Sequence, residues 1–410
     1  MGIRQSLANP SSPSAPSAMR APDPEILICG AGISGLALAK RLEQLGFKSI
    51  RIFEADESLQ SRPQGYSLTI QQPGRQALKT LGLLDAAKSC SRWGGGGQHF
   101  VNALNGSVIR SVGVQEVHED PARPKAKPGR RSNFYIPRQK LRALLAESLE
   151  ATSIVFSEKI ESYQESGDAV TLTTSSGRKV SAALLVGCDG VNSAVRKHKL
   201  TDSLSFLGVG MINGLVHSSA ASAALSEVCG AGSLHLLDGT RRLFMKPFEV
   251  EGQAMWQLTF PADLGQIDAI RALPKQELHA WAMSETSSWC PEYQSILQGT
   301  SPSTLRAGGL YDRDPLHCAR HSGARTAVIG DAAHPMTPFI GQGANQALTD
   351  SIQLAESLSR CRDEFGRLDT SSVSDSNGIV SPQATATATG TLNQTPPPPR
   401  PSCPPPVLLQ

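Results

Sequence analysis

The order of apolar and polar positions predicts alternating strands and helices in the first part of the chain. Residues 25–29 form a short apolar run, which is typical of a strand buried on both faces of a sheet. After a glycine-rich turn, residues 36–45 carry apolar side chains at helical spacing, and a second apolar run follows at residues 49–53. This strand–helix–strand order predicts an α/β fold with a parallel sheet.

Further along the chain, the period changes to that of strands. Residues 154–188 alternate in the manner of antiparallel strands, most clearly at 170–174 and 184–188. Between residues 203 and 310, strand-like runs continue and one helical run interrupts them. These are the strands at 232–237, 243–247 and 254–260 and the helix at 265–283. The pattern predicts a sheet domain inserted between pieces of the α/β domain.

The remaining periodic segments extend the first domain. They are helices at 73–81, 139–149 and 344–359 and a buried strand at 324–329. The expected division is 25–90, 130–200 and 311–367 for the first domain, 91–129 for a loop-rich excursion and 201–310 for the inserted sheet. Residues 1–24 and 368–410 consist largely of Ser, Pro, Ala and Thr, which cannot form a packed core, so we expect both segments to be disordered.

Composition narrows the kind of protein and its location. The chain is 39% hydrophobic and 18% charged with a net charge of +3, and it has no basic stripe with interleaved aromatics, so no nucleic-acid partner is expected. Its eight cysteines are scattered without a C-x-x-C pair, which argues against a metal site and favours a reducing compartment. No apolar run reaches the roughly 18 residues of a membrane span. We expect a cytoplasmic protein and give no weight to the short myristoylation pattern at residues 1–6.

The turn after the first strand has the chemistry of a dinucleotide site. Gly30, Gly32 and Gly35 complete G-x-G-x-x-G, in which glycines allow a tight turn, close approach of a pyrophosphate and contact between helix and strand. The positive end of the following helix dipole faces the phosphates. Glu54 ends the second strand about 20 residues later, where a carboxylate accepts hydrogen bonds from ribose hydroxyls. The turn therefore predicts NAD or FAD, and the acid disfavours NADP at this site.

Two further motifs follow strands in the second half of the chain. Residues 184–196 lead into D-G-x-x-S-x-x-R, which contains Asp189, Ser193 and Arg196. Residues 325–335 end in G-D-A-A-H-P, and G-Q-G-A-N-Q-A follows at 341–347. The order and spacing of these motifs and of the first glycine turn are more specific than any one of them alone.

Together, the three motifs resemble the class A single-component FAD-dependent monooxygenases, the aromatic hydroxylase or salicylate hydroxylase-like family, over roughly residues 26–359. The resemblance implies a Rossmann-type FAD-binding domain with an inserted antiparallel-sheet substrate domain. It also implies an enzyme that uses NAD(P)H and O₂ to hydroxylate or epoxidise a small aromatic or polyketide- or terpenoid-type substrate through a flavin C4a-hydroperoxide, as in secondary metabolism. The nicotinamide cofactor would then dock without a Rossmann domain of its own.

The resemblance also implies roles for individual residues. Asp331 would hydrogen-bond the ribityl chain of FAD, Arg138 of x-P-R-x-x-L would lie near the phosphates, and the helix start at 341–345 would face the pyrimidine edge of the flavin. The implied FAD residues are Gly30, Gly32, Ser34, Gly35, Glu54, Gly65, Arg138, Asp189, Gly330, Asp331, Gly343, Ala344 and Asn345. Asp189, Ser193 and Arg196 belong to the motif that the family also uses for the NAD(P)H pyrophosphate.

No catalytic base is implied, because the pocket residues vary widely within such a family. We interpret His217, His235 and Tyr311 as structural, and His334, which precedes Pro335, as a residue that shapes the backbone.

The chain departs from the family pattern near its end, where helical spacing stops at about residue 367 and low-complexity sequence follows. Family members usually continue with helices that close the cofactor domain. This leaves open a truncated, non-catalytic flavin-fold protein that binds a partner through its Pro-rich tail. A reductase or halogenase of the same fold is a second alternative, although no W-x-W-x-I-P segment is present. A plain NAD dehydrogenase is disfavoured because G-D-A-A-H-P would have no task in it.

Overall fold

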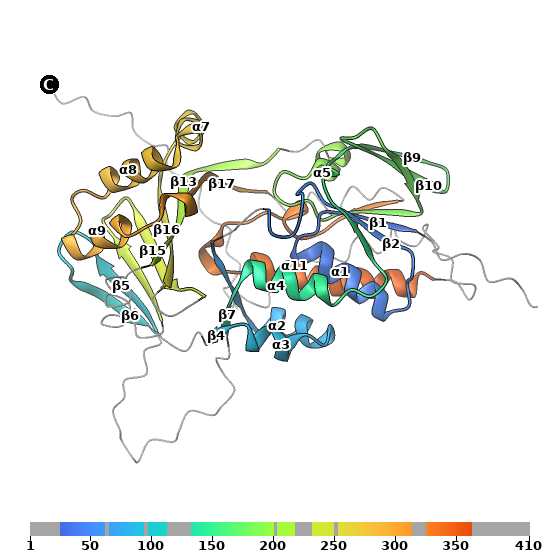
Figure 1. The fold of residues 1–410 in the computed structure, drawn as a ribbon, viewed down its shortest axis with the longest axis horizontal. Helices are drawn as coiled ribbons and strands as arrows, with labels where there is room; N and C mark the ends of the chain where they lie inside the picture. Colours follow the sequence, from blue (N-terminus) through green and yellow to red (C-terminus); the bar gives the residue numbers. More distant parts are fainter. Residues whose placement is uncertain are drawn as a thin grey trace, which may run out of the picture.

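The computed structural model describes residues 25–61, 65–93, 97–112, 133–200, 203–217, 232–249, 253–313 and 325–362. This part of the chain forms two halves that lie side by side, one built on a parallel sheet and the other on a larger, mainly antiparallel sheet (Figure 1). Both segments expected to be disordered lie outside the described residues.

The first half is centred on a five-stranded parallel sheet in the order β18-β12-β1-β2-β8. Its strands are β1 (Ile26–Cys29), β2 (Ile50–Phe53), β8 (Ser153–Val155), β12 (Leu184–Gly187) and β18 (Thr326–Val328). All residues of β1 are buried, as the apolar run predicts for a central strand.

Both faces of this sheet are covered. Ile28, Ile52 and Val186 pack on one face against α1 (Ile33–Gln44), α4 (Arg138–Glu147) and α11 (Gly343–Arg360). Alternate residues, including Leu27 and Leu185, pack on the other face against an antiparallel sheet. That sheet consists of β9 (Ile160–Ser166), β10 (Ala169–Thr174) and β11 (Lys179–Ala182).

The prediction that residues 154–188 are all antiparallel was therefore wrong at its two ends. β8 and β12 belong to the parallel sheet, and only β9 to β11 are antiparallel. β12 is buried at every residue because it has a strand on each side and a layer on each face. Such a strand shows a continuous apolar run instead of alternation.

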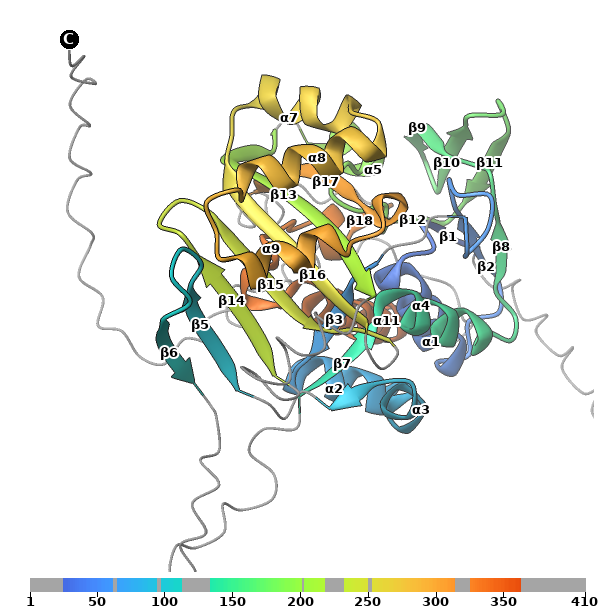
Figure 2. The same ribbon diagram turned by 60° about the vertical axis from the view of Figure 1, so that its left-hand side comes forward.

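The second half is a seven-stranded sheet in the order β17-β13-β16-β15-β14-β5-β6. Its strands are β5 (Gln98–Asn102), β6 (Val108–Val112), β13 (Ser205–His217), β14 (Ser233–Leu237), β15 (Arg242–Pro247), β16 (Gln253–Pro261) and β17 (Arg306–Asp312). All neighbours are antiparallel except β14 and β5. Figure 2 shows how the strands of this sheet follow one another.

Part of the segment expected to be a loop-rich excursion belongs to this sheet. β5 pairs with β14, and Val101 is buried in the core of the sheet. Two short strands, one of them exposed along its whole length, gave too weak a pattern to predict. Residues 113–129 of the excursion lie outside the described residues.

Helices cover the outer face of the large sheet (Figure 1). They are α7 (Leu264–Ala272), α8 (Lys275–Glu285) and α9 (Pro291–Gln298). The single helix predicted over 265–283 is thus two helices. Pro274 is the N-cap of α8, and a proline disfavours helical geometry in the residue before it, so α7 has to end there.

Side chains of the large sheet divide between its two faces with a period of two. Leu243 and Met245 of β15 belong to the core with the helices, whereas Arg242, Phe244 and Lys246 face the other half of the molecule. On β14, Leu234 and Leu236 are core residues and His235 faces inward to the junction. The inner face of this sheet therefore presents polar and aromatic side chains to the α/β half.

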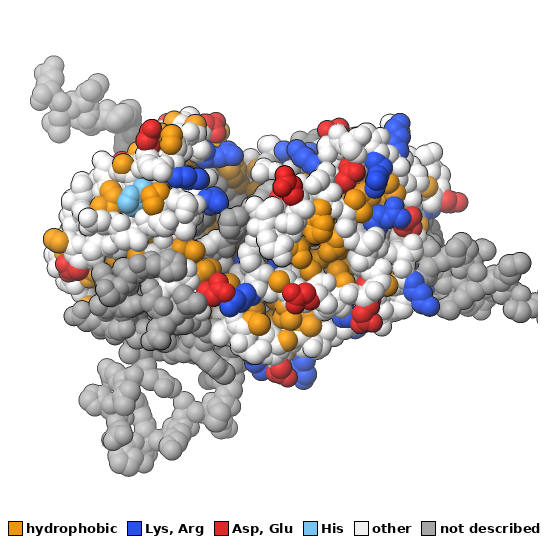
Figure 3. Space-filling view, viewed as in Figure 1, with side chains coloured by type: hydrophobic (Ala, Val, Ile, Leu, Met, Phe, Trp, Pro, Cys, Tyr) orange, Lys and Arg blue, Asp and Glu red, His pale blue; other side chains and the backbone are white. Residues whose placement is uncertain are grey.

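A small sheet and two helices complete the junction. The strands β3 (Ser67–Ile70), β7 (Phe134–Pro137) and β4 (Arg92–Trp93) lie in the order β3-β7-β4, and α2 (Gln72–Thr80) and α3 (Leu84–Ser89) pack beside them. In the described part of the chain, no helix has the length and apolar character to cross a membrane. Acidic and basic side chains are intermixed on the face shown in Figure 3.

Candidate active site

The main cavity lies at the junction of the two halves and has a volume of about 1000 Å³. One end is lined by the glycine turn, by Asp331 and by the start of α11, and the other end by β13 to β16 of the large sheet. This volume is at the upper end of the roughly 300–1,000 Å³ of small-molecule sites. The cavity therefore suits a cofactor together with a second molecule.

The three glycines of the turn do different things. Gly30 has a φ of +98°, and a Cβ there would lie 2.6 Å from the Cys188 carbonyl oxygen. A Cβ at Gly35 would lie 2.0 Å from the Gly30 carbonyl oxygen, so α1 can pack on β1 only without a side chain. At Gly32 the nearest protein atom to a Cβ would be 3.8 Å away, and this residue lines the cavity with Ser34. The free space above Gly32 is where a pyrophosphate fits.

Glu54 supports the turn directly. Its Oε2 accepts hydrogen bonds from the Ala31 N–H (2.7 Å) and from Arg142 Nη2 (3.2 Å), and its Oε1 accepts one from the Asp56 N–H (2.9 Å). Arg142 Nε also donates to the Ala31 carbonyl oxygen (2.7 Å). A carboxylate has about four acceptor positions, so one remains for a ribose hydroxyl. Sequence reasoning missed Arg142, which lies four residues after Arg138 and so on the same side of α4.

Arg138 reaches the cavity from the first residue of α4. Its guanidinium lies close to Gly32 and hydrogen-bonds the hydroxyl of Tyr66. A fixed cation beside an open glycine turn is what the phosphates of a dinucleotide require. The expected backbone contact of Gly65 with the cofactor stays a prediction; this residue packs against Leu215 of β13, whose Cγ would be 2.9 Å from a Cβ at this position.

Asp331 and His334 lie on the loop after β18. The carboxyl of Asp331 is open to the cavity, but the cavity walls shield it from bulk water. This desolvation raises the pKa of Asp331, although the positive charges of His334 and Arg138 act in the opposite direction. Burial opposes a charged imidazole at His334 and is the largest single effect, but the hydrogen bond of its Nε2 to Asp350 Oδ2 (2.6 Å) and the negative charges of Asp350 and Asp331 together raise its pKa. Asp350 of α11 also accepts from the Gly330 N–H (2.9 Å) and so clamps the loop, a role that the sequence did not reveal.

The start of α11 offers backbone donors to the cavity. Its N-cap residue, Gln342, makes no side-chain cap, and Gly343 and Ala344 line the cavity beside Asp331. The side chain of Asn345 is engaged within the protein, so a contact of this residue with the cofactor stays a prediction for its backbone. It accepts from the Gln71 N–H (2.8 Å) and donates to the Thr69 and Gly341 carbonyl oxygens (2.9 and 2.8 Å), which leaves only its backbone for a cofactor.

Gly190 and Val191 of the D-G-x-x-S-x-x-R motif line the cavity, whereas the side chains of Asp189, Ser193 and Arg196 make contacts within the protein. Asp189 Oδ2 accepts from the Ala194 N–H (2.7 Å), and Ser193 caps α5 (Ala194–Lys199). Arg196 is 2% exposed and donates to the carbonyl oxygens of Ala332 (2.8 Å) and Val191. The expected contact of these three residues with a pyrophosphate stays a prediction: Asp189 Oδ1 is buried without a hydrogen-bond partner, whereas Ser193 and Arg196 are engaged within the protein. Arg196 positions the loop that carries Asp331, because a buried guanidinium needs several acceptors and one of these is the Ala332 carbonyl oxygen.

The sheet-side end of the cavity contains residues that the sequence left without a role or treated as structural. His235 stacks on Phe100 at 4.3 Å between ring centroids, and its Nδ1 accepts from Arg242 Nη2 (3.0 Å). Burial, with a smaller contribution from Arg242, lowers the pKa of His235 to about 4, so the ring is neutral at pH 7. Tyr311 also lines the cavity, whereas the side chain of His217 lies outside the described residues.

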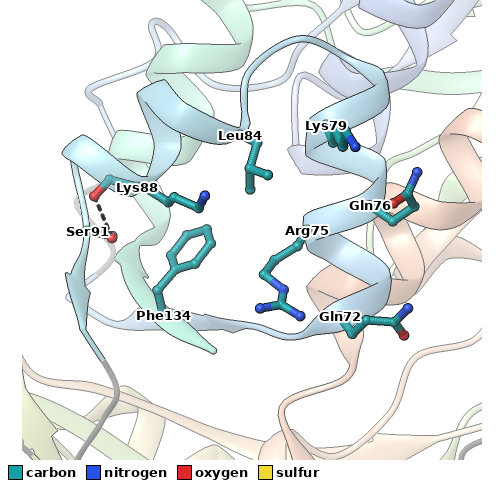
Figure 4. A pocket seen from close by; sticks show the side chains of 8 residues that line it. All are labelled: Gln72, Arg75, Gln76, Lys79, Leu84, Lys88, Ser91 and Phe134. Carbon is teal, nitrogen blue, oxygen red and sulfur yellow. Dashed lines mark hydrogen bonds between the residues drawn. The ribbon is translucent and has the colours of Figure 1, made fainter. Parts of the chain in front are cut away.

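A second, smaller hollow of about 320 Å³ lies between α2, α3 and β7. Figure 4 shows Arg75, Lys79 and Lys88 around it, with a hydrogen bond from Ser91 Oγ to the Lys88 carbonyl oxygen (2.7 Å). It includes neither the glycine turn nor Asp331, so the main cavity is the candidate active site. Among the described residues, no three His, Cys, Asp or Glu side chains come together as metal ligands.

The geometry agrees with a specific class of protein. The sequence model of the FAD binding domain family matches residues 23–263 and 313–368, more than half of the chain. The chain therefore belongs to this family, and it is an FAD-dependent monooxygenase of class A with FAD as its cofactor. The resemblance inferred from the three motifs and the predicted α/β fold with an inserted sheet are confirmed.

Individual relatives have diverse activities. The aurachin C monooxygenase/isomerase of Stigmatella aurantiaca is 29% identical over 337 residues, which cover 82% of this chain and 80% of that protein. The FAD-dependent urate hydroxylase of Klebsiella oxytoca is 25% identical and covers 83% of each chain. Relatives also include longer proteins: the chain spans 52% of the zeaxanthin epoxidase of Prunus armeniaca at 25% identity over 87% of its own length.

Among solved structures, 2,6-dihydroxypyridine-3-hydroxylase from Arthrobacter nicotinovorans matches with a TM-score of 0.70 at 18% identity, over 90% of this chain and 92% of that one. HpxO of Klebsiella pneumoniae, solved with FAD and uric acid, matches with a TM-score of 0.66 at 22% identity, over 86% of this chain and 83% of that one. These likenesses show a shared fold.

Proposed function

We propose that this enzyme uses NADPH or NADH and O₂ to hydroxylate or epoxidise a small aromatic or alkene-bearing molecule of the polyketide or terpenoid kind. The observation that carries the proposal is the continuity of the cavity. The same space is lined by the glycine turn and Asp331 at one end and by aromatic and methionine side chains of the large sheet at the other. Bound FAD supplies the redox chemistry, in which a nicotinamide is the reductant and O₂ the source of the transferred oxygen.

The described residues fit this cofactor. Gly32 leaves room for the pyrophosphate, and Arg138 provides positive charge beside it. Asp331 points its carboxyl into the cavity, where it can hydrogen-bond the ribityl hydroxyls. The N–H groups at the start of α11, together with the positive end of the helix dipole, would stabilise negative charge on a bound flavin.

The other half of the cavity holds the substrate and keeps water away from it. Met211, Met255, Phe244 and Tyr311 provide an apolar surface against which a flat molecule can pack. Phe339, on the 3-10 turn Pro338–Ile340 beside the helix start, also lines the cavity. Exclusion of water matters because a reactive oxygen species would otherwise be released as peroxide.

One preparation of the purified full-length chain tests the proposal. Its visible spectrum reports bound flavin, and NADPH and NADH oxidation is then measured with a panel of phenols and alkenes, with product analysis by mass spectrometry. We expect a yellow protein whose reductant consumption is stimulated by a substrate and whose product has gained one oxygen atom. A well-folded, colourless protein would contradict FAD binding. A yellow protein that consumes no reductant with any compound would favour the truncated, non-catalytic alternative, and reductant oxidation without oxygenated product would favour a reductase.

A further inference from the structure

The sheet-side end of the cavity contains a buried cation without a charged partner. Lys246 of β15 is 2% exposed, and its Nζ donates to the Ser67 carbonyl oxygen (3.1 Å) and to Thr69 Oγ1 (3.5 Å). The same Nζ lies 4.4 Å from the centroid of the Tyr135 ring. No carboxylate of the described residues lies within ion-pairing distance of it. Since a buried charge is normally paired, this ammonium group favours an anion beside it on the cavity side.

The neighbouring charges on this wall have the same sign. Arg242 lies four residues before Lys246 on the same face of β15 and also lines the cavity, with its guanidinium 5.3 Å from the ring centroids of both Phe244 and Phe339. Asp331, at the flavin end, is the one acid among the described residues that line the cavity. The sheet-side wall therefore attracts an anion and not a cation.

Three polar atoms of the same wall have no hydrogen-bond partner although they are buried. They are Asn213 Oδ1 on β13 and Ser233 Oγ and His235 Nε2 on β14, and all three residues line the cavity. Buried polar groups are nearly always hydrogen-bonded, so these atoms mark where polar groups of a bound molecule belong. The aromatic and methionine side chains beside them fit the flat part of such a molecule.

We propose that the sheet-side end of the cavity binds the substrate as an aromatic oxygen anion, a carboxylate or an ionised phenol or enol, whose charged oxygen pairs with Lys246. This inference rests on the proposed function and specifies its substrate class. Arg242 adds positive charge to the same wall, while Asn213, Ser233 and His235 hydrogen-bond the remaining polar groups of the substrate. Neutral terpenoid hydrocarbons would leave these groups unpaired and bind weakly.

Binding should depend on pH through Lys246. Burial lowers its pKa to about 7, and an anion beside it would favour the charged form, so anion affinity should be highest below about pH 7 and decrease above it. His235, Tyr135 and Arg242 on the same wall do not change charge near pH 7. The pKa of His235 is about 4, and burial raises the pKa of Tyr135. Arg242 remains charged, although burial lowers its pKa. Asp331 and His334 lie at the flavin end of the cavity. Any pH dependence that they cause remains in a Lys246 variant and can therefore be distinguished from that of Lys246.

The test uses the FAD-loaded full chain and measures binding by calorimetry without reductant, so it does not depend on turnover. The probes are benzoate and salicylate with their neutral amides, and ionisable nitrophenols with nitroanisoles. We expect each anion to bind more tightly than its neutral partner. Lys246→Met should weaken anion binding about tenfold to a hundredfold, the range for a hydrogen bond to a charged group, and leave the amides unchanged. Lys246→Arg should retain part of the preference.

Lys179→Met, at an exposed lysine on β11, is the matched control and should change nothing. Comparison of carboxylates with nitrophenols shows which oxygen anion is preferred. The proposal is overturned if no anion binds more tightly than its neutral partner, or if Lys246→Met retains the preference and its dependence on pH. Loss of reductant oxidation in the separate turnover assay would contradict the proposed function and leave this binding result intact.

Discussion

The clearest quantitative prediction concerns the stability of the enzyme after Lys246→Met. Burial lowers the pKa of this lysine from 10.5 to about 7, so the folded state binds fewer protons than the unfolded state between these values. One pKa unit corresponds to about 1.36 kcal/mol, so the folded protein is destabilised by at most about 5 kcal/mol when the lysine is charged. The substitution also removes the contacts of Nζ with Tyr135, Ser67 and Thr69, and their loss offsets about half of the stability gained by removing the buried charge. We expect Lys246→Met to raise the free energy of unfolding by about 2 kcal/mol at neutral pH.

The sign of the pH dependence provides a stricter test. The destabilisation is complete below about pH 7, where the lysine is charged in both states, and it disappears as pH rises toward 10.5. The advantage of Lys246→Met should therefore shrink with increasing pH. Urea unfolding of both proteins, followed by tryptophan fluorescence at about pH 6, 8 and 10, measures it, with Lys179→Met as control. A variant that is less stable at neutral pH, or an advantage that does not change with pH, would refute the reasoning.

Further predictions concern the flavin end of the cavity. Gly32→Ala should fold normally but bind FAD weakly, because its Cβ enters open space, whereas Gly35→Ala should lower the melting temperature because its Cβ meets a carbonyl oxygen at 2.0 Å; equal behaviour of the two would contradict this. Asp331→Ala should lose more flavin on gel filtration than Asp331→Asn, which keeps one hydrogen-bonding oxygen, and equal retention would argue against a ribityl contact. Asp350→Asn should destabilise the protein by about 1–3 kcal/mol. The raised pKa of His334 makes this loss complete below pH 6.5 and smaller as pH rises through the folded pKa, and melting curves without such a trend would count against the pair.

The sequence was most informative where the backbone conformation or close backbone packing determines which residue fits. Gly30 and Gly35 could be read correctly because a tight turn and a close helix–strand contact admit almost no other residue. The parallel strand β1 was evident for a similar reason, since burial on both faces leaves only apolar residues.

Long-range polar contacts could not be read in this way. Arg196 has the residue type of a phosphate site, but the fold turns its guanidinium inward to the Ala332 carbonyl oxygen, and nothing local to the motif determines that. Asp350 and Lys246 acquire their roles only from partners on distant segments. The sheet-side wall was therefore the part of the site that required the structure.

The alternation along β15 has a consequence for how such enzymes diversify. Its even-numbered residues, Arg242, Phe244 and Lys246, line the cavity, while Leu243 and Met245 pack against the helices. Selection for a new substrate and selection for a stable core therefore act on different positions of the same strand. On the binding mode proposed above, removal of the charge at Lys246 alone would redirect the enzyme from acidic to neutral compounds and leave the flavin end of the cavity unchanged.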